Sequence, residues 1–219
     1  MTGSLARAVL WDLDGTLVDS EEYHWRAWRE TMAAEGVSLT REQFLATFGQ
    51  RNDAILREWL KEGATPEAIR RIGEAKEACY RRLVRALGLA AAPGAAEWVR
   101  RLHEEQWVQA VASSAPRLNV ETVLEVTGLA PYFGVTVAAE DVQHGKPDPE
   151  VFLVAAERLG VPPERCVVVE DAPAGIEAAR RAGMRTIGLS RGSCAPAADL
   201  VVRSLEELPP GAFAMLLER

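Results

Sequence analysis

The chain has 219 residues, of which 48% are hydrophobic and 26% are charged, and its formal net charge is −7 at pH 7. This length and composition predict an ordinary globular protein with one sizeable core and a smaller subdomain. The acidic balance leaves no broad electropositive surface, so we expect neither nucleic acid nor a membrane as a partner, and we expect a monomer.

The amino terminus reaches the charged Asp12 after only a short apolar run, which does not match the apolar region of a secretory signal. No uninterrupted apolar span of membrane length follows it. Cys79, Cys166 and Cys194 are odd in number and include no CxxC pair. This pattern argues against a disulfide framework and a thiolate zinc site, so we expect a cytoplasmic protein with reduced cysteines.

The first predicted element is a short buried strand within the stretch Arg7–Ser20, RAVLWDLDGTLVDS. Its apolar residues favour a strand, and Gly15 breaks the strand at its end. Asp12 and Asp14 then lie at the carboxyl edge and point the same way, because strand side chains alternate between faces. Two like charges this close need a cation or a shared proton. A lone D-x-D pair in a solvated turn would need neither.

The next seventy or so residues have the periodicity of helices and predict an inserted helical subdomain. We expect a first helix over Glu21–Glu35, a second opened by a capping box of Thr40 and Gln43, a third over Asp53–Lys61, and a fourth from Pro66 to Leu87.

From Ala95 onward, helices and strands alternate, which predicts a parallel sheet covered on both faces. The fold class is therefore α/β, a Rossmann-like core of residues 1–17 and 91–219 with an inserted all-helical cap of residues 18–90. The expected strands are Val108–Ala112, 135–138, Cys166–Val169, Thr186–Leu189 and Leu200–Val202, and the expected helices are Ala95–Glu105, Arg117–Thr127, Glu150–Leu159 and Ala174–Ala182.

Ligands of such sheets bind outside the carboxyl ends of the strands. Ser113 and Ser114 follow the second strand, where a hydroxyl and backbone N–H groups can hold phosphoryl oxygens. A serine before a proline also fits an ordinary helix cap. Lys146 follows the third strand within GKPDP, whose prolines stiffen the backbone and direct the lysine to a defined place, although an isolated lysine is usually a solvated charge.

Glu170 and Asp171 follow the buried VVV run of the fourth strand. Alone, they could be a charge pair at the start of a helix. Together with Asp12 and Asp14 they make four carboxylates at one edge, which would repel one another without a metal ion. An all-oxygen site beside a phosphate pocket suits Mg²⁺.

These motifs, in this order, resemble those of the haloacid dehalogenase (HAD)-like hydrolases. The opening DLDGTLVDSEEYHWRAW is similar to the branch that contains β-phosphoglucomutases and sugar-phosphate phosphatases, which has a helical (C1-type) cap. The resemblance implies that Asp12 attacks phosphorus to form an aspartyl-phosphate and that Asp14 is the general acid and base. It implies that Ser113 and Lys146 stabilise the phosphoryl oxygens. It also implies that Mg²⁺ is held by Asp12, the backbone carbonyl of Asp14, Asp171 and Glu170.

The resemblance further implies that the cap closes over this edge and selects the leaving group. His24 could face the substrate or simply pack inside the cap. Lys76 could face the substrate or lie on a solvated face of its helix. The candidate substrate-binding residues of the cap are His24, Trp28, Arg51, Asn52 and Lys76.

The chain departs from β-phosphoglucomutases at two places. Those enzymes carry a cap arginine where this chain has Asn52, and a Ser-Lys-Asn run where it has Ala115, Pro116 and Arg117. Both departures remove groups expected to bind a second phosphate, although Arg51 and Arg117 could substitute.

We therefore expect a Mg²⁺-dependent phosphatase of a small phosphorylated sugar or related metabolite. The alternatives are a β-phosphoglucomutase-type mutase and a phosphoglycolate or nucleotide phosphatase. A catalytically silent binding module is disfavoured because every expected catalytic group is present.

Overall fold

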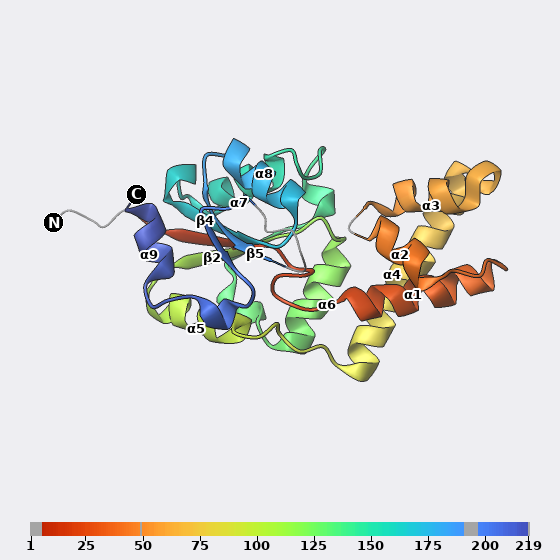
Figure 1. Ribbon diagram of the computed structural model, residues 1–219, viewed down its shortest axis with the longest axis horizontal. Coiled ribbons are helices and arrows are strands. Elements are labelled where there is room, and N and C mark those ends of the chain that lie inside the picture. Colours follow the sequence, from red (N-terminus) through yellow and green to blue (C-terminus); the bar gives the residue numbers. More distant parts are fainter. Residues whose placement is uncertain (1–5, 49, 191–196, 219) are drawn as a thin grey trace. The chain divides into compact units, whose positions relative to one another are not determined.

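The computed structural model describes residues 6–48, 50–190 and 197–218 (Figure 1). These residues form two compact units, one made of the chain up to Asp19 together with the chain from Ala90, and the other made of Ser20–Leu89. Within the described ranges, no helix is long and apolar enough to cross a bilayer. Cys79 and Cys166 are buried free thiols, whereas Cys194 lies outside the described residues.

The first unit contains a six-stranded sheet in the order β3-β2-β1-β4-β5-β6. All neighbouring strands pair in parallel, which confirms the predicted α/β class. The order runs outward from β1 in both directions, so the switch point that binds ligands in open sheets lies at the carboxyl end of β1. The strands are β1 (Ala8–Trp11), β2 (Val108–Ala112), β3 (Val135–Val137), β4 (Cys166–Glu170), β5 (Arg185–Leu189) and β6 (Leu200–Val202).

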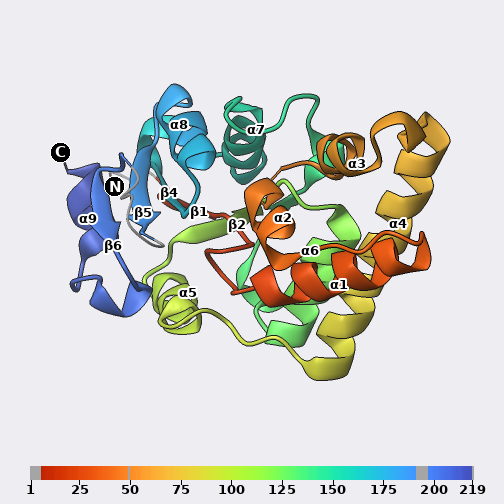
Figure 2. The same cartoon turned by 45° about the vertical axis from the view of Figure 1, so that its right-hand side comes forward.

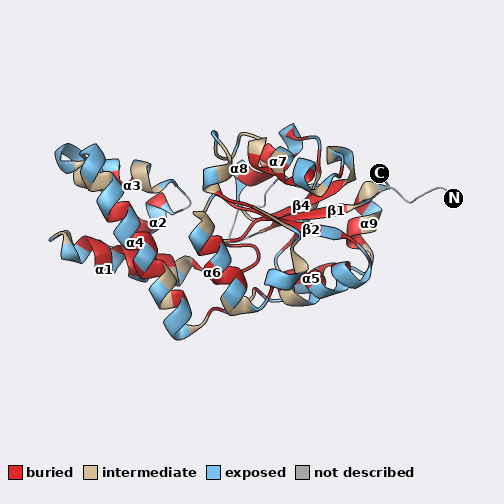
Figure 3. Ribbon diagram, turned by 180° about the vertical axis from the view of Figure 1, so that it is seen from behind, coloured by how far each residue is buried: buried red, intermediate tan, exposed pale blue. Residues whose placement is uncertain are grey.

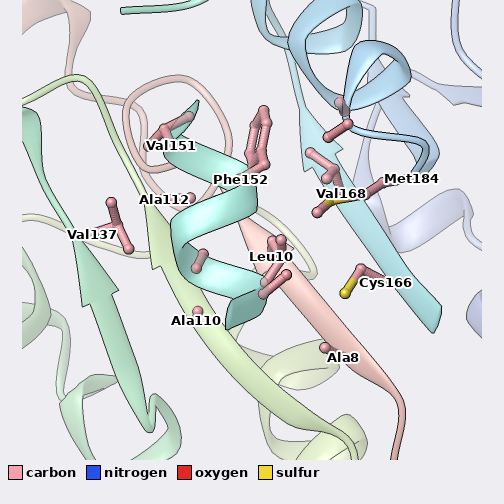
Figure 4. Close-up of a cluster of buried hydrophobic side chains, with 14 of the residues drawn as sticks. Ala8, Leu10, Ala110, Ala112, Val137, Val151, Phe152, Cys166, Val168 and Met184 are labelled. Carbon is pink, nitrogen blue, oxygen red and sulfur yellow. The ribbon is translucent and has the colours of Figure 1, made fainter. Parts of the chain in front are cut away.

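Helices cover both faces of this sheet (Figure 1). They are α5 (Ala95–Glu104), α6 (Arg117–Thr127), α7 (Glu150–Leu159), α8 (Pro173–Arg181) and the short α9 (Ala212–Leu217), which the sequence did not predict. On one face, Leu10 of β1 packs with Phe152 of α7 in a cluster that also includes residues of α8 (Figure 4). On the other face, the ring of Phe213 lies 6.1 Å from that of Trp11 and 5.3 Å from that of Trp98.

The inner strands β1 and β4 consist almost entirely of apolar residues because both of their faces are buried. All four residues of β1 are fully buried, and so are all five of β4 (Figure 3). The polar residues at the carboxyl ends of these strands are therefore attached to backbone that is buried and excluded from water.

The second unit consists of α1 (Glu21–Ala34), α2 (Arg41–Thr47), α3 (Asn52–Leu60) and α4 (Pro66–Leu87). The predicted capping box at α2 is confirmed, since Thr40 Oγ1 accepts from the Gln43 backbone N at 3.2 Å and Gln43 Oε1 accepts from the Thr40 backbone N at 2.9 Å. Helix α1 packs against α4 and crosses it at an angle (Figure 2). Trp25, Trp28 and Met32 face inward from α1 as the centre of this unit's own core.

Candidate active site

Asp12 is the first residue after β1, and it is nearly buried, with 8% of its surface exposed. Its backbone N donates to Val169 O at 3.0 Å, which continues the sheet pairing beyond β1. The chain then turns at Gly15, which has a φ of 94°. A Cβ at this position would lie 2.1 Å from Asp171 Oδ2, so only glycine lets the turn approach Asp171 this closely.

Lys146 connects the ends of three neighbouring strands. Its Nζ donates to Asp12 Oδ1 at 2.6 Å after β1, to Ala112 O at 3.2 Å in β2, and to Glu170 Oε1 at 2.9 Å in β4. Only 8% of its side-chain surface is exposed. The lysine of GKPDP is thus fixed in position and is not a mobile surface charge.

Burial and charge act in opposite directions on this pair. Burial raises the pKa of Asp12, Lys146 lowers it, and the carboxylates of Glu170 and Asp171 raise it further. Burial alone would lower the pKa of Lys146, but Asp12 and Glu170 outweigh that effect and raise it. Lys146 therefore stays protonated at neutral pH and supplies a positive charge at the end of β1.

Three of the predicted metal ligands come together here. Asp12, Glu170 and Asp171 each offer a carboxylate oxygen within 4.8 Å of the others. Glu170 Oε2 also accepts from the Ala172 backbone N at 2.6 Å, and Thr16 Oγ1 lies 3.5 Å from Asp171 Oδ1. An all-oxygen set of this kind fits a hard divalent cation such as Mg²⁺.

Asp14 is half-buried in the turn after β1, where it forms a β-bridge with Val18. Of the four carboxylates expected at this edge, three cluster, and the side chain of Asp14 is not among them.

A second group of possible ligands comprises His144, Asp148 and Glu150. The two carboxylates of this group have structural roles at the start of α7. Glu150 accepts from the Gln143 and His144 backbone N–H groups, and Asp148 accepts from the Glu150 backbone N.

Ser113 directly follows Ala112 in β2 and is 2% exposed. Its backbone N donates to Val137 O at 3.0 Å, and its Oγ accepts from the Ala115 backbone N at 3.0 Å. The next residue, Ser114, is exposed. Because Ala112 O is itself a partner of Lys146, Ser113 lies beside the lysine at the carboxyl edge of the sheet.

Within the second unit, Lys76 is buried, with 3% of its surface exposed, so it does not belong to a solvated helix face. Its Nζ lies 2.9 Å from His24 Nδ1 and 2.9 Å from Glu77 Oε1, and 5.2 Å from the centre of the Trp28 ring. Asn52 Nδ2 donates to the same Glu77 oxygen at 2.6 Å. Four of the five predicted cap residues thus form one cluster around a carboxylate.

Arg51 is the exception, because its side chain is exposed and its Nε pairs with Asp53 Oδ1 at 3.3 Å. Glu77 is the residue that sequence reasoning missed. Burial alone would raise its pKa, but Lys76, His24 and Asn52 more than offset this and lower it. In the sequence, Glu77 follows Lys76 inside an amphipathic helix. Such Lys-Glu pairs are too common to indicate a functional site.

Known proteins resemble this chain over most of its length. Residues 6–183 match the family described as haloacid dehalogenase-like hydrolase. The Fructose-1-phosphate phosphatase YqaB of Escherichia coli is 35% identical over 82% of this chain and 94% of its own length. The Beta-phosphoglucomutase of Bacillus subtilis is 31% identical over 92% of this chain and 91% of its own.

Among solved structures, a mutant of CbbY from Rhodobacter sphaeroides in complex with Xylulose-(1,5)bisphosphate is similar, with a TM-score of 0.83 and 31% identity. The match covers 93% of this chain and 96% of the CbbY chain.

Proposed function

The chain belongs to the haloacid dehalogenase-like hydrolases and is a phosphatase, and we propose that its substrate is a small phosphorylated sugar or related metabolite. We propose that the reaction depends on Mg²⁺ and passes through an aspartyl-phosphate. In this proposal the first unit is the catalytic core and the second unit is a cap that selects the leaving group.

The observation that carries the proposal is the contact between Lys146 and Asp12 at 2.6 Å, beside the carboxylates of Glu170 and Asp171. A nucleophilic carboxylate must meet an anionic phosphate, and their repulsion has to be balanced by positive charge. Lys146 supplies one positive charge at that place. The clustered carboxylates are suited to bind a metal ion, which would supply a second positive charge.

In the proposed first step, an oxygen of Asp12 forms a bond to phosphorus while the bond from phosphorus to the leaving-group oxygen breaks. Asp14 gives its proton to that oxygen, so the alcohol leaves uncharged. In the second step, Asp14 takes a proton from water, whose oxygen attacks the same phosphorus and releases Asp12 and inorganic phosphate. Ser113 and Lys146 stabilise the phosphoryl oxygens in both steps.

Asp12, Asp171, Glu170 and the backbone carbonyl of Asp14 are the groups proposed to hold Mg²⁺. When bound, the ion supplies charge compensation between the nucleophile and the phosphate.

For the leaving group, we assign recognition to His24, Asn52 and Lys76, with Arg51 as an outer contact. Trp28, which the sequence also suggested, is 2% exposed in the core of the second unit and packs against Lys76. Support for a sugar comes from the relative named as a fructose-1-phosphate phosphatase. The hydroxyl groups of a sugar suit a cluster that contains an amide, an imidazole and an ammonium group, because these groups donate and accept hydrogen bonds.

The test is inorganic phosphate release from a panel of sugar phosphates and phosphoglycolate, with Mg²⁺ and with EDTA. Fast release that depends on Mg²⁺ supports the proposal and identifies the substrate. The panel includes β-glucose 1-phosphate with glucose 1,6-bisphosphate. Little release together with conversion to glucose 6-phosphate would contradict the proposal in favour of a mutase.

A further inference from the structure

A carboxylate closes the amino end of α6, four residues after Ser113. The Glu140 oxygens lie 2.9 and 3.2 Å from the Arg117 backbone N, which is the first N–H of that helix. A helix amino terminus carries partial positive charge and unpaired N–H groups, and it is a common place for a phosphate to bind. In this chain, one of the protein's own carboxylates already occupies it.

The side chain of Arg117 is also held by an acidic residue. Its guanidinium pairs with the Asp141 carboxylate. Asp141 further accepts from Arg158 Nη2 at 2.9 Å and from the Ala138 backbone N at 2.8 Å. These bonds lower the pKa of Asp141, even though burial acts in the other direction. Arg117 is therefore part of a fixed network and does not present an uncommitted positive charge.

This acidic end of α6 belongs to the same edge of the sheet as the predicted phosphate-binding serine. Four residues of extended chain reach at most about 14 Å, so the Arg117 backbone lies within that distance of Ser113. This upper bound is wide enough to include the span between the two phosphates of a small sugar bisphosphate. A second phosphate directed toward α6 would meet Glu140 instead of free N–H groups.

The second unit shows the same pattern within its own boundaries. Three of the predicted cap residues that could bind a second phosphate are each paired with a carboxylate of that unit. Arg51 Nε lies 3.3 Å from Asp53 Oδ1, and both Asn52 and Lys76 contact Glu77 Oε1, at 2.6 and 2.9 Å.

Resting on the function proposed above, we infer that this enzyme selects esters with a single phosphate and an uncharged leaving group. Glu140 is the specificity-determining residue that excludes a second phosphate. The inference sets this chain apart from its relative that binds a bisphosphorylated sugar, despite the similar fold.

The test compares kcat/KM for fructose 1-phosphate and fructose 1,6-bisphosphate, and for β-glucose 1-phosphate and glucose 1,6-bisphosphate. Like charges placed against each other in a recognition site are strongly unfavourable, so the native enzyme should prefer the monophosphate by at least about tenfold. The informative variant is Glu140→Gln. Its amide oxygen can still accept from the Arg117 backbone N, so the helix cap is kept and only the charge is removed.

The matched control is Glu207→Gln. Glu207 Oε2 also accepts from a backbone N–H, that of Arg203 at 2.8 Å, but it follows the outermost strand β6. We expect Glu140→Gln to raise kcat/KM for the bisphosphate and to leave the monophosphate value unchanged. The control should change neither value.

Equal use of both substrates by the native enzyme would overturn the inference and leave the phosphatase proposal intact. The inference is also overturned if Glu140→Gln lowers both values in parallel, since that is the signature of a structural cap. If no monophosphate is hydrolysed with Mg²⁺, the proposed function fails and the inference fails with it.

Discussion

The Lys146 Nζ atom lies 2.6 Å from Asp12 Oδ1, although the two residues are 134 positions apart in the sequence. This contact joins the loop after β3 to the end of β1, at the point where the strand order reverses. It places a buried positive charge against the proposed nucleophile.

Replacing Lys146 should remove most of the activity. In Lys146→Gln, the buried positive charge is lost while the side chain stays polar, so the phosphoryl oxygens lose a partner in the transition state. We expect kcat to fall by about 100-fold or more. The control is Lys61→Gln, which removes a lysine that is exposed in the second unit. Steady-state phosphate release measures both variants, and similar kcat values for the two would contradict the role of Lys146.

A methyl group at Gly175 should displace Glu170. A Cβ there would lie 1.7 Å from Glu170 Oε1, the oxygen that accepts from Lys146. Gly175→Ala should therefore lower activity and destabilise the protein by about 1–3 kcal/mol, because the site is already closely packed. At Gly134 the nearest atom to an added Cβ is 3.9 Å away, so Gly134→Ala is the control. Activity and thermal unfolding of both variants test this prediction.

Metal binding should be visible without turnover. A cation that binds only the folded protein raises its unfolding temperature by mass action. We expect Mg²⁺ to raise the unfolding temperature of the native protein and to have no such effect on Asp171→Asn, which lacks one of the clustered carboxylates. Glu62→Gln, which changes an exposed residue of the second unit, should respond as the native protein does. A full response from Asp171→Asn would contradict the metal site.

The stability contributed by Glu77 should depend on pH. Glu77→Gln leaves Lys76 buried without its counter-charge and should destabilise the protein by about 3 kcal/mol at pH 7. The pKa of Glu77 in the folded protein is lowered from the ordinary value of 4.5. Its contribution is therefore fully present above the unfolded pKa and is lost as the pH falls through the lower folded pKa.

The unfolding temperatures of the native protein and Glu77→Gln should thus converge as the pH falls below about 4.5. Glu67→Gln, on the exposed first turn of α4, serves as the control and should follow the native curve. A gap between the native protein and Glu77→Gln that stays constant from pH 7 to acid would show that Glu77 does not act through its charge.

The elements of the fold could be predicted from sequence because their signals are local. Apolar runs predicted the buried strands, and β2, α6, α7 and β6 have the predicted ends. The capping box at Thr40 is likewise determined by a segment of four residues, from Thr40 to Gln43. Helix α9 was missed because six apolar residues after a Gly-Pro-rich stretch do not distinguish a short helix from a buried coil.

The specific pairs within the site could not be predicted in the same way. Motif order predicted that Asp12, Lys146, Glu170 and Asp171 meet, because the carboxyl ends of parallel strands share one edge. No motif in the sequence indicates the contacts of Glu77 with Asn52 and of Glu140 with Arg117. Each depends on side-chain packing between elements about 25 residues apart, which helix and strand periodicity do not encode.

Asp12 is proposed as the nucleophile of a Mg²⁺-dependent phosphatase, and phosphate release by Asp12→Asn tests this role most directly. The amide is isosteric and too weak a nucleophile to form the aspartyl-phosphate. We predict that turnover of the best sugar monophosphate is abolished while the circular dichroism spectrum and unfolding temperature show a folded protein. Substantial phosphate release by the folded variant would contradict the account.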